Sequence, residues 1–225
     1  MQTKHFPVAT VSIIILNAVI FAVGLLSGEQ IQIIQNYSFI PNHIFNVYDE
    51  NNNTQQNPLT SLLQPSEQPQ PSSLPDSLTR LFSSMFIHAS IAHIAFNLFA
   101  LAYLGGYAER AIGVPWYVLV YFTSGIVAAL FHGAIASYIL HNGGVVLIGA
   151  SGAISGILGI AAAAGNTRAY YWLVIQIVFA VIGSINALPI AFTAHVGGFI
   201  AGVVMTKGLL RLEQSKRKSR CFLQP

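Results

Sequence analysis

Charged side chains are scarce in this sequence. Of its 225 residues, 8% are Asp, Glu, Lys or Arg, whereas 54% are hydrophobic, and the mean hydropathy is +0.62. Because a soluble globular domain is usually about 25% charged, this composition indicates a membrane protein. Six apolar runs approach the ~20 residues that a helix needs to cross the hydrocarbon core. They are Pro7 to Leu26, Ile91 to Tyr107, Trp116 to Leu140, Val145 to Ala164, Tyr170 to Ile182 and Pro189 to Thr206. We therefore predict an all-α polytopic membrane protein, a compact bundle of six transmembrane helices.

Cysteine is almost absent, and the few basic residues are unevenly placed. The single Cys221 excludes an intramolecular disulfide. If six spans alternate, every Lys and Arg except Arg80 falls on the side that holds both termini. The positive-inside rule makes that side the cytoplasm, and we expect the protein in the cell membrane. The run KRKSR at 216–220 is interpreted as a topogenic or lipid-headgroup cluster, and we expect no nucleic-acid partner.

The chain divides into four predicted parts. Residues 1–27 form the cytoplasmic N-terminus and first transmembrane helix, which is longer than the ~7–15-residue core of a signal peptide. Residues 28–79 form an external loop, residues 80–210 the core with helices two to six, and residues 211–225 a basic cytoplasmic tail. The loop is rich in Asn, Gln, Pro and Ser, so we predict that it is partly disordered. Its sequons at Asn36 and Asn52 would face the exterior.

Strongly polar side chains inside apolar spans are costly, and each is a functional candidate. The candidates are His93, Asn97, His132, Ser151, Ser155 and His195. At ~1.5 Å rise per residue, Ser151 and His195 lie about 8 and 9 Å below the outer boundary, and Asn97 and His93 about 12 and 6 Å below it. Four polar residues from three spans are therefore predicted to share one layer near the external face.

Glycines before Ser151 predict where its helix begins. Gly143, Gly144 and Gly149 disfavour helix, so the helix is expected to start inside the membrane. Irregular backbone at that depth is tolerated only inside protein or beside water, which predicts a cavity open to the exterior above Ser151. The helix N-terminus would offer N–H groups and a positive dipole to a developing oxyanion.

Small residues around Ser151 support two interpretations. Small side chains on one helix face allow close helix packing, and here they are Gly152, Ser155, Gly156 and Gly159. Taken alone, this pattern favours a packing role for the serine. However, His195 has Gly198 and Gly202 on its own face. If the two strips pack together, hydroxyl and imidazole come within hydrogen-bond reach, as nucleophilic catalysis requires.

The remaining histidines allow other interpretations. His132 has no polar partner in the sequence pattern and is interpreted as structural. His93 and Asn97 are spaced i, i+4, so both can point at the same oxygen. A metal site formed by His88, His93 and His195 is a competing hypothesis, but no carboxylate or thiol accompanies them at that depth. We therefore predict no metal.

Three motifs together resemble the rhomboid family of intramembrane serine proteases. They are HIAFNLFALAYLGGYAER at 93–110, GASG at 149–152 and AHVGGFIAG at 194–202, and the resemblance covers roughly Arg80 to Leu210. It implies that Ser151 is the nucleophile and His195 the general base, in a dyad without an acidic third member. It further implies that the oxyanion is stabilised by His93, Asn97 and the Ser151 backbone N–H. Structural support is expected from Gly149, Gly152, Gly198, Gly202, Glu109 and Arg80, and His88 is also expected to be structural.

The sequence differs from the family's pattern at two places. Ser155 stands where many bacterial members have an aromatic residue that packs on the catalytic histidine. Thr79-Arg80 stands where members often have Trp-Arg in the first external loop. We therefore expect the orientation of the His195 imidazole and the anchoring of the first external loop to differ from those in other family members.

The resemblance implies a serine endopeptidase that cleaves single-pass membrane proteins within their transmembrane segments, near the external face, without a cofactor. One alternative is a non-proteolytic membrane chaperone or trafficking factor with the same fold, although such relatives generally lack the serine or the histidine. A channel or transporter is a second alternative. It would need polar residues that continue to the inner side, and below Asn97 the spans are almost wholly apolar.

Overall fold

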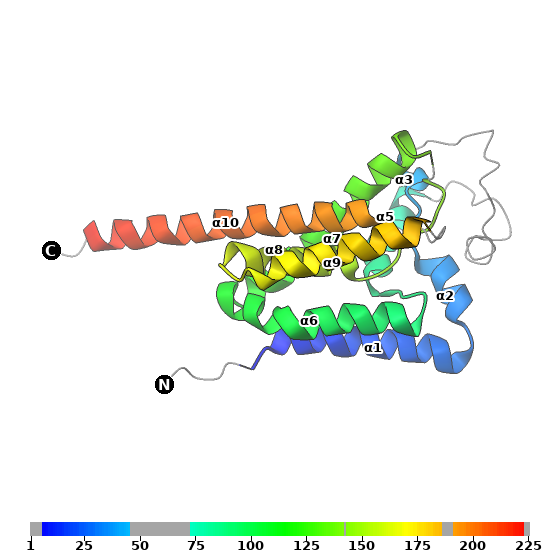
Figure 1. Cartoon of the computed structure of the whole chain (residues 1–225), viewed down its shortest axis with the longest axis horizontal. Helices are drawn as coiled ribbons and strands as arrows, with labels where there is room; N and C mark the ends of the chain where they lie inside the picture. The colour runs from blue at the N-terminus through cyan, green and yellow to red at the C-terminus, as the bar shows by residue number, and fades with distance from the viewer. Residues whose placement is uncertain (1–5, 46–72, 142, 186–190, 223–225) are drawn as a thin grey trace.

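The computed structural model describes residues 6–45, 73–141, 143–185 and 191–222, and this part of the chain is mainly helical (Figure 1). One antiparallel bridge pairs Phe39 with Leu147. The helices are α1 (Val8–Ser27), α2 (Gln30–Tyr37), α3 (Asn42–Phe45), α5 (Leu74–Ser83), the 3-10 helix η1 (Ser84–Phe86), α6 (Ile91–Ile112), α7 (Val114–Tyr138), α8 (Ser151–Ala163), α9 (Arg168–Ile185) and α10 (Phe192–Phe222). The all-α prediction is confirmed.

Several of these helices are suited to a bilayer. Four are long and apolar enough to cross it, and they are Val8–Ser27, Ile91–Ile112, Val114–Tyr138 and Phe192–Lys216. The helix α8 is apolar but only 13 residues long. The protein is thus an integral membrane protein, and the count of six spans stays a prediction.

The short helix α8 lies at the centre of the bundle. Every residue from Gly152 to Ala162 is buried, and α8 contacts α6, α7, α9 and α10. A helix that is apolar on all sides is stable only when protein or lipid surrounds it completely. Large apolar side chains on the outer helices are exposed instead, among them Val19, Phe99, Val174 and Val204. The outer helices therefore present the lipid-facing surface, and α8 is shielded from it.

Glycines bring α8 and α10 into close contact. A β-carbon on Gly198 would overlap the carbonyl oxygen of Gly152, and one on Gly202 would overlap that of Gly156. A β-carbon on Gly159 would lie 2.5 Å from the carbonyl oxygen of Phe199. The two strips of small residues thus face each other, and their backbones touch as in other small-residue helix pairs in membranes.

Glu109 ties α6 to the start of α1. Its buried carboxylate accepts hydrogen bonds from the backbone N–H of Ala9 at 3.2 Å and of Thr10 at 2.8 Å, and from the Thr10 hydroxyl at 2.8 Å. The first N–H groups of a helix have no partner within it and carry partial positive charge. Glu109 supplies that partner across 99 residues of sequence.

The predicted external loop is more regular than its composition suggests. Its described residues include α2, α3 and most of α5. Arg80 joins two of these helices, because its guanidinium contacts Asp76 at 2.9 Å and donates to the carbonyl oxygen of Gln35 at 2.9 Å. The sequon at Asn36 falls in α2. Residues 46–72, with the sequon at Asn52, lie outside the described part.

The last helix continues into the predicted basic tail. In Figure 1, α10 runs past the ends of the neighbouring helices, on the side where α1 begins. The start of α1 and the end of α10 therefore share one side of the bundle, which is the arrangement an even number of spans produces.

Candidate active site

The segment before α8 reaches Ser151 without helical structure. It is held by the bridge between Phe39 and Leu147 and by the N–H of Gly149, which donates to the carbonyl oxygen of Ser84 at 2.9 Å. Gly149 has φ +113°, a conformation that side chains disfavour. After this turn the chain enters α8 at Ser151, as the glycines in the sequence predict.

Ser151 and His195 form a hydrogen-bonded pair between two helices. The Ser151 Oγ lies 2.9 Å from the His195 Nε2. Ser151 is half-buried at the start of α8, and His195 is 8% exposed in the first turn of α10. If the hydroxyl donates, Nε2 accepts and the neutral imidazole carries its proton on Nδ1. This geometry matches a serine nucleophile and its base.

The other side of the His195 ring lacks an acid. Among the described residues, its buried Nδ1 has no hydrogen-bond partner. Two residues earlier, the Thr193 hydroxyl lies 2.6 Å from Nδ1 of His132 on α7. This contact fixes the beginning of α10 against α7. Sequence reasoning gave His132 no polar partner, and the structure supplies Thr193.

His93 and Asn97 are one turn apart on α6, and His93 lies beside the turn that carries the serine. A β-carbon on Gly149 would lie 2.7 Å from His93 Nε2 and 3.8 Å from Ser151 Oγ, so the imidazole borders the turn that carries the serine. Asn97 is 2% exposed, and its Nδ2 donates to the carbonyl oxygen of His93 at 3.0 Å. An amide nitrogen has two protons, so one remains for another acceptor.

The first turn of α8 adds backbone donors. The first intrahelical bond runs from the N–H of Ile154 to the carbonyl oxygen of Ala150. The N–H groups of Ser151, Gly152 and Ala153 precede it and have no intrahelical acceptor. Such groups at a helix N-terminus attract negative charge.

A second polar pair, Ser155 and Gln176, lies one turn below the serine, and only Ser155 was named as a candidate from the sequence. Ser155 is fully buried, and its Oγ lies 2.8 Å from the carbonyl oxygen of Ser151 and 3.0 Å from Oε1 of Gln176 on α9. Gln176 is 2% exposed. The sequence could have identified Gln176 as a candidate, because it is an amide inside the apolar run Tyr170 to Ile182.

The three histidines of the metal hypothesis are not gathered as ligands. His88 and His93 are adjacent, with ring centroids 4.9 Å apart. In the parts of the chain that the structure describes, no group of three His, Cys, Asp or Glu side chains is arranged to hold a metal ion.

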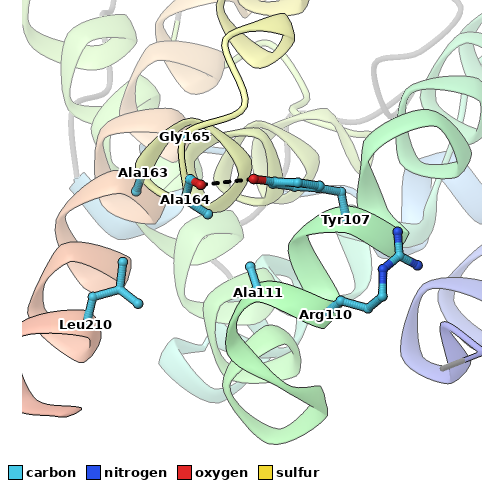
Figure 2. A pocket seen from close by; sticks show the side chains of 7 residues that line it. All are labelled: Tyr107, Arg110, Ala111, Ala163, Ala164, Gly165 and Leu210. Atoms are coloured by element: carbon cyan, nitrogen blue, oxygen red, sulfur yellow. Dashed lines mark hydrogen bonds between the residues drawn. The ribbon is translucent and has the colours of Figure 1, made fainter. Parts of the chain in front are cut away.

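A separate cavity lies at the far end of α8. It has a volume of about 770 Å³ and is lined by Tyr107, Arg110, Ala111, Ala163, Ala164, Gly165 and Leu210 (Figure 2). Figure 2 shows the Tyr107 hydroxyl donating to the carbonyl oxygen of Ala164, at 2.9 Å. Ser151 begins α8 and this cavity surrounds the end of that helix. The cavity is therefore distinct from the serine and histidine pair.

The fold and the pair define a class: a helical integral membrane protein that joins a serine to a histidine across two closely packed helices. The Rhomboid domain family model matches residues 75–212, more than half of the chain. The chain therefore belongs to the rhomboid family.

Similar proteins match more than half of the chain. Rhomboid-type serine protease 2 of Emericella nidulans is 32% identical over 154 residues, covering 64% of this chain and 29% of the relative. Rhomboid protease GlpG of Serratia proteamaculans is 32% identical over 146 residues, covering 61% and 50%. RHOMBOID-like protein 1 of Arabidopsis thaliana is 29% identical over 134 residues, covering 56% and 33%. The chain thus spans half or less of the length of these relatives.

Proposed function

We propose that this protein is an intramembrane serine endopeptidase in which Ser151 is the nucleophile and His195 the general base. The observation that carries the proposal is the 2.9 Å contact between Ser151 Oγ and His195 Nε2. The names of the fungal and bacterial relatives, which are called rhomboid proteases, support the same reaction class.

The reaction follows from the tautomer of His195. Nε2 takes the hydroxyl proton as Ser151 Oγ attacks a peptide carbonyl, and the imidazolium then gives that proton to the leaving amine. A water molecule, deprotonated by the same nitrogen, hydrolyses the acyl-enzyme and regenerates the serine. No acid contacts Nδ1 among the described residues, so the base works as half of a dyad.

The tetrahedral intermediate places negative charge beside the first turn of α8. In the proposal the oxyanion accepts hydrogen bonds from the Ser151 N–H, the free amide proton of Asn97 and the His93 ring. His93 borders Gly149 and Ser151, and Asn97 lies one turn away on the same helix face. Donors fixed before reaction contribute most where water is excluded.

The proposed substrates are single-pass membrane proteins, cut within the transmembrane segment near the external face. A stable helix hides its peptide carbonyls in its own hydrogen bonds, so cleavage requires a segment that unwinds locally, such as one containing Gly. We expect both termini of the enzyme in the cytoplasm, because basic residues flank them.

A fluorophosphonate probe tests the nucleophile directly. Purified protein in detergent should be labelled covalently, and Ser151→Ala and His195→Ala should each abolish labelling while both variants keep their helical content. The control Ser12→Ala makes the same substitution at an exposed position on α1 and should label normally. Equal labelling of the parent and Ser151→Ala would contradict the proposal.

Cleavage of a membrane substrate separates the protease from a non-proteolytic family member. Reconstituted protein should release the external fragment of a single-pass substrate that has Gly residues near its outer end, and Ser151→Ala should not. Retention of the substrate by both proteins without cleavage would favour the chaperone or trafficking role instead.

A further inference from the structure

Gln176 has no assigned role, yet it is a buried amide in the apolar helix α9. It is 2% exposed, and the neighbouring positions of α9, Val174 and Ile175, are apolar and partly exposed. Its hydrogen-bond partner among the described residues is Ser155, which is itself fully buried. Burying an amide is unfavourable unless it is hydrogen-bonded. An aliphatic side chain would fill the same space without that cost, so packing alone does not explain an amide at this position.

The direction of the hydrogen bonds follows from proton counting. Ser155 Oγ is near two oxygens, the Ser151 carbonyl at 2.8 Å and Gln176 Oε1 at 3.0 Å. A hydroxyl has one proton and cannot donate to both. Because amide oxygen and nitrogen are assigned from the hydrogen-bond network, both contacts are hydrogen bonds only when the Gln176 amide is turned so that its NH₂ donates to Ser155. Ser155 then donates to the Ser151 carbonyl.

This chain of donors ends on the peptide that follows the candidate nucleophile. The Ser151 carbonyl belongs to the same peptide group as the Gly152 N–H, which lies in the first turn of α8 without an intrahelical acceptor. Hydrogen bonds in series polarise one another. A donor to this carbonyl therefore fixes the peptide plane and strengthens its N–H as a donor on the side of the serine.

We propose that Gln176 is a positioning residue, which acts through Ser155 to orient the Ser151–Gly152 peptide for the reaction. The inference rests on the proposed protease function. It assigns to α9 a polar contribution to the active site, from a helix that otherwise contacts the core through apolar side chains.

Replacement of Gln176 by Met keeps the length of the side chain and removes both amide groups. The expected result is a fall in kcat of roughly three- to tenfold, with KM unchanged and the rate of fluorophosphonate labelling reduced by the same factor. Ser155→Ala should give a similar loss. The double variant should lose no more than the larger single effect, because the two residues act in one chain.

The control is Val174→Met, which places the same side chain on the exposed face of α9 and should leave kcat unchanged. If the parent is labelled and Gln176→Met keeps its labelling rate but has a lower melting temperature, Gln176 is structural and the inference is wrong. If only helical substrates are affected while the small probe is not, Gln176 governs access rather than orientation, which also overturns it. A parent that is not labelled would overturn the protease function itself.

Discussion

Gly198 of α10 lies directly against the carbonyl oxygen of Gly152, the residue that follows Ser151 in α8. No side chain separates the two backbones at this point. Gly198 follows His195 by three residues in α10. Because Gly198 has no β-carbon, the two helices can approach closely enough for Ser151 and His195 to meet.

Gly198→Ala should separate α8 from α10. The added methyl group overlaps backbone, which cannot move aside as a flexible side chain can, and overpacking of this kind costs about 1–3 kcal/mol. A displacement of the nucleophile from its base by about 1 Å can lower turnover about 100-fold. The measurement is kcat in detergent, together with thermal unfolding. Gly208→Ala is the matched control, because nothing lies within 4 Å of its β-carbon position, and it should be neutral or slightly stabilising.

Asn97→Ala should lower turnover without unfolding the protein. Loss of one oxyanion donor typically costs about 2.7–4 kcal/mol of transition-state stabilisation, or roughly 100- to 1000-fold in kcat. The chain offers a close control in Asn17 of α1. Asn17 is also buried, and its Nδ2 also donates to the carbonyl oxygen four residues earlier, at 2.8 Å. Asn17→Ala should reduce stability alone, and equal kcat losses in both variants would remove Asn97 from the catalytic hypothesis.

Glu109→Gln should destabilise the bundle by loosening α1. The carboxylate accepts three hydrogen bonds at the start of that helix, and hydrogen bonds to charged groups contribute about 1.5–3 kcal/mol each. A neutral amide has one oxygen and keeps part of this pattern, so we expect a net loss of about 2 kcal/mol. Thermal unfolding of the parent and the variant measures this loss of stability. Glu213→Gln, at an exposed position of α10, should unfold at the parent's temperature.

Much of the arrangement around Ser151 could be predicted from the sequence because it depends on backbone. Glycines that disfavour helix predicted the irregular segment before Ser151, and small residues at i+3 and i+7 from His195 predicted the face that meets α8. Both signals are local, and neither requires knowledge of how a helix is rotated about its axis.

The contacts of Gln176 and Thr193 could not be predicted in the same way. Their partners, Ser155 and His132, lie on other helices, and hydropathy does not specify which side chains meet across a bundle. The end of α10 was also missed. Residues 209–222 contain no Gly or Pro and are rich in Leu, Lys, Arg, Glu and Gln, which favour helix, so the charged tail continues the membrane helix.

His88 should make the fold sensitive to acid. It is 1% exposed, and burial, together with the neighbouring His93, lowers its pKa from 6.5 to about 3. The unfolded chain takes up a proton near pH 6.5, whereas the native state does not, so stability falls as the pH drops below that value. We expect a loss of about 1–2 kcal/mol between pH 7.5 and 5, measured by unfolding in detergent. His88→Phe keeps a ring of similar size and should flatten this dependence. An unaltered slope in His88→Phe would show that other groups titrate.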